Sequence, residues 1–269
     1  MLNPIWIAGI SSALAWTPLV NDAGKEVFFG YSDVHYSINL SGAHGMAQED
    51  VEYAITKSAE VWMGGGMRFI YDGETTESSP KQGDGFNVFF EDGWSQDPGI
   101  LALTYTWSDT ETGEIDHFDI AINSDHFDWT STGEAGKYDL ENAITHEFGH
   151  ALGLDHSEDP DASMAPTASP DEVIKRNPND DDITGYRTIY PGSPTSEGAG
   201  SGGDAPPDGD APPSGSSGSL AGGGSASYGG GGGGMASEEG GGCTTAKSTP
   251  SALGLLLLAA FIGRKRELT

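Results

Sequence analysis

Cysteine and basic side chains are both scarce in this chain of 269 residues. The single cysteine, Cys243, excludes an intramolecular disulfide framework, so a hydrophobic core or a bound metal must stabilise the fold. Lysine and arginine together number 12, against 41 aspartates and glutamates, and the formal net charge is −29. Because no basic surface is available to neutralise phosphates, nucleic acid is excluded as a partner. The acidity suits calcium binding, a saline habitat or simply a soluble surface.

Long hydrophobic runs are missing as well. The longest, residues 252–262, would span about 17 Å as a helix at ~1.5 Å per residue. A hydrocarbon core is ~30 Å thick, so this run is marginal as a permanent membrane span.

One short stretch carries most of the chemistry, reading H-E-x-x-H-x-x-G-x-x-H from His146 to His156. On a helix, His146 and His150 project from one face, one turn apart. Gly153 can adopt the left-handed conformation that ends a helix, so that His156 supplies a third nitrogen. Three neutral imidazoles and one open position are the ligand set of a catalytic zinc. The alternative is a histidine-rich helix end, but this spacing arises by chance in roughly one such chain in ten thousand.

The residues after the motif carry a family resemblance. Met164 follows the third histidine at the distance expected of a Met-turn, with Pro166 close behind, and Ser157 comes directly after His156. In this pattern the chain resembles the metzincin clan of zinc peptidases and, within it, the matrixin (matrix metalloproteinase) family. The resemblance implies that Met164 lies beneath the metal. It also implies that Glu147 is the catalytic general base, which accepts a proton from zinc-activated water and delivers it to the leaving amine.

The resemblance covers residues 25–191 and implies an α+β fold. We expect a twisted mixed five-stranded sheet, two long helices and a small C-terminal subdomain that ends in a third helix. Alternating or apolar stretches predict the strands, and apolar residues at helical spacing predict the first helix. The predicted strands are residues 34–40, 67–71, 87–90, 98–103 and 118–123, and the predicted helices are 47–62, the motif helix and 181–191.

The strand that contains Ile100, Leu101 and Ala102 resembles the family's edge strand. Its free backbone groups would pair with an extended polypeptide substrate, which is recognition by strand addition. The resemblance therefore implies a zinc metalloendopeptidase, expected as a monomer, that hydrolyses extracellular proteins. The alternative is an inactive, zinc-stabilised binding module, but its signature would be loss of Glu147 or of a histidine, and neither is lost.

The chain also departs from the family. Matrix metalloproteinases hold a second, structural zinc with three histidines and an aspartate. Leu103 stands where one of those histidines is expected, and His117 alone cannot make the site, so we expect no structural zinc. Calcium binding and a solvated acidic surface both remain open for five loop carboxylates, Asp92, Asp97, Asp116, Asp119 and Asp125. The family's inhibitory propeptide cysteine has no counterpart before the first strand.

The two ends predict export and surface attachment. Residues 1–22 are interpreted as a shortened signal peptide or an N-terminal extension, and residues 192–242, rich in Gly, Ser and Pro, as a disordered linker. Residues 243–269 place Cys243, an apolar run and a basic cluster in the order of myxobacterial sorting tails. Cys243 would then be the processing or lipid-attachment point, although an unused thiol is the alternative. We expect a protein exported to, or anchored at, a bacterial cell surface.

Overall fold

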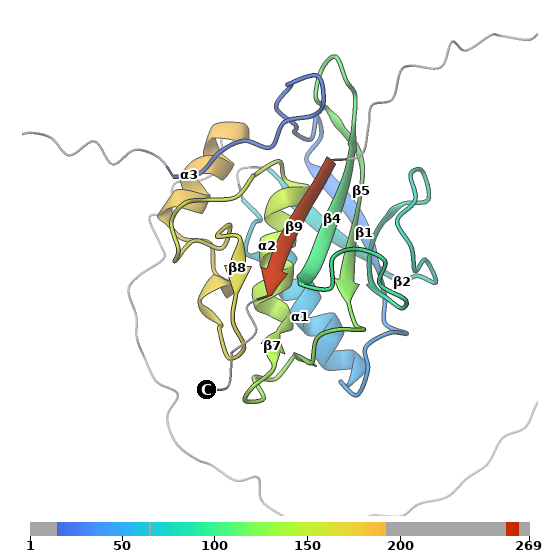
Figure 1. The fold of residues 1–269 in the computed structure, drawn as a ribbon. Coiled ribbons are helices and arrows are strands. Elements are labelled where there is room, and N and C mark those ends of the chain that lie inside the picture. Colours follow the sequence, from blue (N-terminus) through green and yellow to red (C-terminus); the bar gives the residue numbers. More distant parts are fainter. Residues whose placement is uncertain (1–14, 65, 192–256, 264–269) are drawn as a thin grey trace, which may run out of the picture. The chain divides into compact units, whose positions relative to one another are not determined.

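The computed structural model describes residues 15–64, 66–191 and 257–263, and these form a mixed sheet packed against helices (Figure 1). The strand order is β2-β1-β3-β5-β4-β9-β8, and a separate two-stranded sheet pairs β6 with β7. The strands are β1 (Asp33–Asn39), β2 (Arg68–Glu74), β3 (Phe86–Glu91), β4 (Ile100–Ser108), β5 (Ile115–Asn123), β6 (Trp129–Thr130), β7 (Tyr138–Asp139), β8 (Thr167–Ala168) and β9 (Leu257–Gly263). The helices are α1 (Gln48–Glu60), α2 (Leu140–Ala151), the short 3-10 helix η1 (Ile174–Arg176) and α3 (Asp180–Ile189).

The predicted α+β class and the five-stranded mixed sheet are confirmed. Strands β2, β1, β3 and β5 are parallel to one another, and β4 runs antiparallel to β5. The β4 strand is longer than predicted and reaches Ser108. Beyond β4, the sheet is extended by β9, which is antiparallel to β4 and parallel to β8. The C-terminal apolar run, considered above as a short helix, is therefore a strand over Leu257–Gly263.

The core lies between the sheet and the two long helices. Helix α2 packs against α1 and β4. Phe148 of α2 is fully buried, and its ring centroid lies 4.8 Å from that of Phe69 and 5.4 Å from that of Tyr36. Such rings dominate the burial of apolar surface in a core of this size. The Trp62 indole donates a hydrogen bond to the carbonyl of Thr145 (2.9 Å), which fixes α2 against the end of α1.

Residues 15–22 belong to the segment interpreted above as a shortened signal peptide or an N-terminal extension, and they contact the domain that follows. The Leu19 amide donates to the carbonyl of Gly153 (2.8 Å), and the Ala15 amide donates to the Asp181 carboxylate (2.9 Å). The linker 192–242 and Cys243 lie outside the described residues. Within the part of the chain that is described, no helix is long and apolar enough to cross a membrane.

Candidate active site

The start of α2 is held by a capped and ion-paired aspartate. Asp139 is the N-cap, and its side chain accepts a hydrogen bond from the Asn142 amide (2.8 Å), which satisfies one of the free N–H groups of the first turn. The Arg176 guanidinium binds the same carboxylate through two nitrogens, at 2.8 and 2.5 Å. This bidentate contact fixes the beginning of α2 relative to η1. It thereby also fixes the orientation of the α2 side chains that follow.

The structure brings the three predicted histidines together. The ring centroids of His146 and His150 are 4.6 Å apart, and the His156 ring lies 5.3 and 4.9 Å from them. One nitrogen from each ring lies within 4.8 Å of the other two. His146 and His150 are fully buried on α2, and His156 is half-buried in the loop beyond it.

Backbone carbonyls orient two of the rings. His146 Nδ1 lies 2.6 Å from the carbonyl oxygen of Ser163, and His150 Nδ1 lies 2.7 Å from that of Leu154. A ring that donates from Nδ1 presents the lone pair of Nε2. Backbone carbonyls orient metal-binding histidines in this way. The buried Nε2 of His150 has no hydrogen-bond partner among the described residues. The donor set therefore fits a zinc ion.

The environment keeps the imidazoles of His146 and His150 neutral. Burial lowers the pKa of His150 to about 3, with a further contribution from His156. Burial, followed by the neighbouring His150 and His156, also holds the pKa of His146 well below its usual value. Neutral imidazole is the form that binds a metal, so no proton has to be displaced near neutral pH.

Glu147 is placed beside the histidines and tied to β4. Its Oε2 accepts a hydrogen bond from the Thr104 hydroxyl (2.5 Å), while the buried Oε1 has no hydrogen-bond partner among the described residues. Burial raises the pKa of Glu147 to about 8, and the bond from Thr104 opposes that rise. One carboxylate oxygen is thus anchored, and the other is available for proton transfer. Sequence reasoning missed Thr104, which looked like an ordinary strand residue.

Two glycines allow close approaches around the trio. Gly153 has φ +91°, and a Cβ there would lie 2.1 Å from the carbonyl oxygen of Val27. A Cβ on Gly149 would lie 2.2 Å from the sulfur of Met164. Gly153 therefore permits both the predicted chain reversal and the passage of the N-terminal segment, and Gly149 permits the methionine to pack directly against α2.

Met164 is fully buried in a turn that α3 holds in place. The Asp182 carboxylate accepts hydrogen bonds from the amides of Ser163 (2.7 Å) and Met164 (3.0 Å). The neighbouring Asp181 accepts from the Ser157 hydroxyl (2.7 Å). Because the Ser163 carbonyl contacts His146, Asp182 is linked to the histidine trio through a single residue of the turn.

The predicted substrate-binding strand is β4, and β9 lies along its edge. Residues Ile100 and Ala102 pair with Ile262 and Phe261 of β9, and Leu101 is fully buried. The other edge of β9 pairs with β8, where Thr167 is opposite Ile262. Strand β9 therefore pairs with β4 along one edge and with β8 at the end of the other edge.

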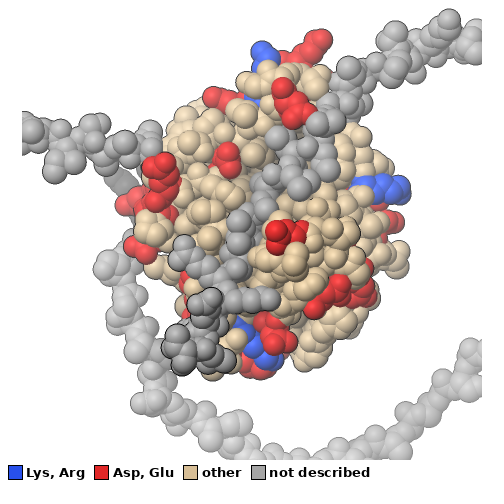
Figure 2. All heavy atoms as spheres, in the orientation of Figure 1, with Lys and Arg blue, Asp and Glu red and all other residues tan. Residues whose placement is uncertain are grey.

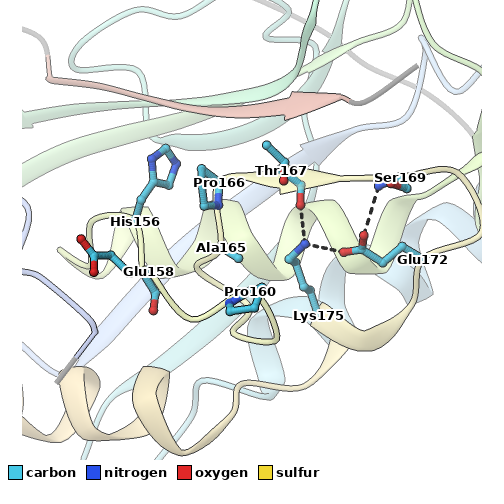
Figure 3. Close-up of a pocket in the computed structure, with 10 residues that line it drawn as sticks. His156, Glu158, Pro160, Ala165, Pro166, Thr167, Ser169, Glu172 and Lys175 are labelled. Atoms are coloured by element: carbon cyan, nitrogen blue, oxygen red, sulfur yellow. Dashed lines mark hydrogen bonds and ion pairs between the residues drawn. The ribbon is translucent and has the colours of Figure 1, made fainter. Parts of the chain in front are cut away.

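A cavity of about 570 Å³ opens next to His156 (Figure 3). His156 and Glu158 lie at one end of it, and the ion pair between Lys175 and Glu172 lies at the other. Lys175 also donates to the Thr167 carbonyl (2.5 Å). Four residues that follow the Met-turn line this cavity, Thr167, Ser169, Glu172 and Lys175.

The aspartates considered for calcium are dispersed. Asp125 accepts from the Trp94 amide (2.7 Å), Asp97 from the Gly99 amide (2.7 Å) and Asp116 from Gln82 (3.3 Å). Asp92 contacts His44 at 3.2 Å. Within the described ranges, only Asp119 of the five belongs to a cluster of three or more metal-binding side chains. Calcium binding therefore stays a prediction.

Leu103 stands where a histidine of the family's structural zinc is expected. It packs in an apolar cluster with Phe89, Trp94, Tyr105 and Ala121.

Comparison with known proteins agrees with this geometry. Metalloendoproteinase 4-MMP of Arabidopsis thaliana is 37% identical over 109 residues, which cover 40% of this chain and 31% of that protein. Macrophage metalloelastase of Oryctolagus cuniculus is 32% identical over 155 residues, covering 55% of this chain and 30% of that protein. The chain thus spans less than a third of the length of these relatives. The Matrixin family model matches residues 29–191, more than half of the chain. The chain therefore belongs to the matrixin family.

Proposed function

We propose that this protein is a zinc-dependent endopeptidase that hydrolyses peptide bonds of extracellular proteins. The observation that carries the proposal is the histidine trio, two of whose rings are buried and neutral, with the unbonded Glu147 oxygen beside it. His146, His150 and His156 would hold one catalytic ion. A bound zinc supplies the Lewis acidity that activates water and polarises the scissile carbonyl.

The chain's own residues would move the proton. Glu147 Oε1 accepts it from the attacking water and transfers it to the leaving amine, while Thr104 keeps the carboxylate oriented through Oε2. The raised pKa of Glu147 suits this role, because a general base works best when its pKa lies near the operating pH. No covalent intermediate is required.

An extended polypeptide would bind as a strand between β4 and β8. Support comes from β9, whose backbone pairs with β4 on one side and with β8 on the other. The chain direction of β9, antiparallel to β4, supports the same direction for a substrate. The cavity beside His156 would receive the side chain that follows the scissile bond. It combines the apolar Ala165 and Pro166 with the Lys175–Glu172 pair, so it suits a side chain with a polar end.

The setting we propose is a monomer exported to, or anchored at, a bacterial surface. The support is the sequence alone, namely the Gly-rich linker 192–242 and the tail with Cys243, its apolar run and its basic cluster. Mass spectrometry of protein recovered from the producing cells tests this point. Cleavage or lipid attachment at Cys243 supports it, and an intact unmodified C-terminus contradicts it.

Casein or gelatin digestion tests the activity. The purified chain should cleave either protein, a chelator should abolish cleavage, and added zinc should restore it. The alternative, an inactive zinc-stabilised binding module, predicts bound zinc without cleavage in any of these conditions. Such a result, with zinc content confirmed by elemental analysis, would refute the proposed peptidase.

A further inference from the structure

A second cluster of metal-binding side chains lies away from the histidine trio. It consists of Asp84, His117 and Asp119, and one donor atom of each lies within 4.8 Å of the other two. His117 and Asp119 are alternate residues of β5 and so project from the same face of the sheet. Asp84 comes from the segment between β2 and β3. The cluster therefore joins two parts of the chain that are distant in sequence.

The cluster is buried and its hydrogen bonding is incomplete. The side chains of His117, Asp84 and Asp119 are 3%, 11% and 0% exposed. His117 Nε2 and both carboxylate oxygens of Asp84 are buried and have no hydrogen-bond partner among the described residues. Buried polar groups without such partners are rare in folded proteins, and they call for a bound ion or another explanation.

The distances inside the cluster are those of ligands around an ion. His117 Nε2 lies 3.6 Å from Asp84 Oδ1 and 3.4 Å from Asp119 Oδ2. These separations are long for hydrogen bonds. Zinc binds imidazole nitrogen and carboxylate oxygen at ~2.0–2.2 Å, so two ligands of a tetrahedral site lie about 3.3–3.6 Å apart. The separations observed fall in that range.

The surroundings hold the donors in place. The Asp119 carboxylate accepts from the Lys81 amide (2.8 Å) and the Asn87 amide (3.1 Å), and the His117 ring lies edge-on to Trp107, with centroids 5.0 Å apart. Among the described residues, one ammonium group contacts the cluster: Lys81 Nζ lies 3.3 Å from Asp84 Oδ2, and its side chain is 64% exposed. Two buried carboxylates beside a largely solvated cation leave negative charge that a divalent ion would neutralise.

We propose that Asp84, His117 and Asp119 bind a second zinc ion, with the fourth position open to solvent on the side of Asp84. Calcium fits less well, because it takes six to eight oxygen ligands and this site contains an imidazole. The expectation of no structural zinc concerned a site of three histidines and one aspartate. The donors here are two carboxylates and one histidine. The proposed role of the bound ion is to hold the segment between β2 and β3 against β5.

Elemental analysis of the full-length chain, dialysed against buffer without metal, tests the site. The wild type should retain two equivalents of zinc, and His117→Gln and Asp84→Asn should each retain one. His150→Ala should also retain one, and Glu147→Ala should retain two. The matched control is His44→Gln, which removes an exposed histidine–aspartate contact (His44 to Asp92, 3.2 Å) and should leave two equivalents.

The stability of the same variants separates this site from the catalytic one. Asp84→Asn should lower Tm in zinc-containing buffer while peptide cleavage by the folded protein is unchanged, because the cluster shares no residue with the histidine trio. The competing explanation is a protonated His117 that bridges the two carboxylates. It predicts one equivalent of zinc in the wild type, lost in His150→Ala and unchanged in His117→Gln, and that result would overturn the proposal. A protein that binds two equivalents of zinc but cleaves no peptide would refute the proposed function and would still support the second zinc site.

Discussion

At the residue scale, the pairing of Glu147 with Thr104 is the contact that local sequence does not reveal. The spacing of His146, His150 and His156 indicated a common site, because helix geometry puts the first two on one face and Gly153 returns the third. Thr104 lies 43 positions from Glu147, and only the packing of β4 on α2 brings the two together. Motif spacing therefore cannot predict which side chains of another helix or strand will contact a site residue.

Thr104→Val tests this positioning role. Loss of the hydroxyl should reduce kcat by about 10- to 150-fold, since a hydrogen bond to a charged group contributes ~1.5–3 kcal/mol. The hydrogen bond from Thr104 lowers the pKa of Glu147, so its removal should raise that pKa. The base must be deprotonated to act, and the acidic limb of the kcat/KM profile should move to higher pH. Thr104→Ser should restore both values; an acidic limb that does not move in Thr104→Val would contradict the role.

At the element scale, α3 supports the site through one buried carboxylate. Asp182 is fully buried and accepts hydrogen bonds from the amides of Ser163, Met164 and Asn179. The first turn of α3 is acidic, with Asp180, Asp181 and Asp182. The cap itself is Asn179, whose side chain accepts from the Asp181 and Asp182 amides in a capping box.

Asp182→Asn should destabilise the protein by about 2–3 kcal/mol. An amide offers one acceptor oxygen and turns its NH₂ group toward backbone donors, so that at least one buried N–H loses its partner. Urea denaturation measures the change. Asp180→Asn removes the same charge from an exposed position of the same first turn and should change the free energy of unfolding by less than ~0.5 kcal/mol. Equal effects of the two substitutions would show that charge, and not the buried hydrogen bonds, matters.

The elements of the sheet were predictable where their pattern is local. Alternation or apolar runs located β1, β2, β3 and β5 to within a few residues, and helical spacing located α1. The position of β9 was not predictable. Its apolar run is equally compatible with a short helix, a membrane segment or a strand, and its pairing depends on the distant edge of β4.

Removal of β9 should increase activity toward peptides. If a substrate binds along β4 as proposed, β9 competes with it, and an edge that is free one-tenth of the time raises the apparent KM about tenfold. A chain ending at Pro191 should therefore show a lower KM and an unchanged kcat. A full-length chain with Ala259→Pro and Ala260→Pro, which lose backbone N–H donors, should behave similarly. Identical KM values for the full-length and shortened chains would contradict competition at this edge.

At the scale of the whole molecule, acidic side chains dominate the surface. On the face shown in Figure 2, acidic side chains are more frequent than basic ones. A net charge of −29 favours solubility and repels other anions, but self-repulsion also destabilises the compact state. With no disulfide available, bound metal is expected to contribute to stability.

Chelation should lower Tm measurably. A ligand present at 100 times its Kd stabilises the folded state by ~2.7 kcal/mol, which corresponds to about 5–10 °C for a domain of this size. The measurement is best made on Asp84→Asn, in which the histidine trio is the remaining zinc site. Scanning calorimetry with and without chelator gives the shift. Addition of His150→Ala should abolish it, and a shift that persists would mean that the trio does not hold the ion.

Cleavage by Glu147→Ala, measured on a sample whose zinc content is determined in parallel, tests the central claim most directly. The substitution leaves His146, His150 and His156 in place, so the zinc content should equal that of the wild type. Loss of the general base should reduce kcat by at least ~10²-fold. A variant that binds zinc and cleaves casein at the wild-type rate would contradict the account.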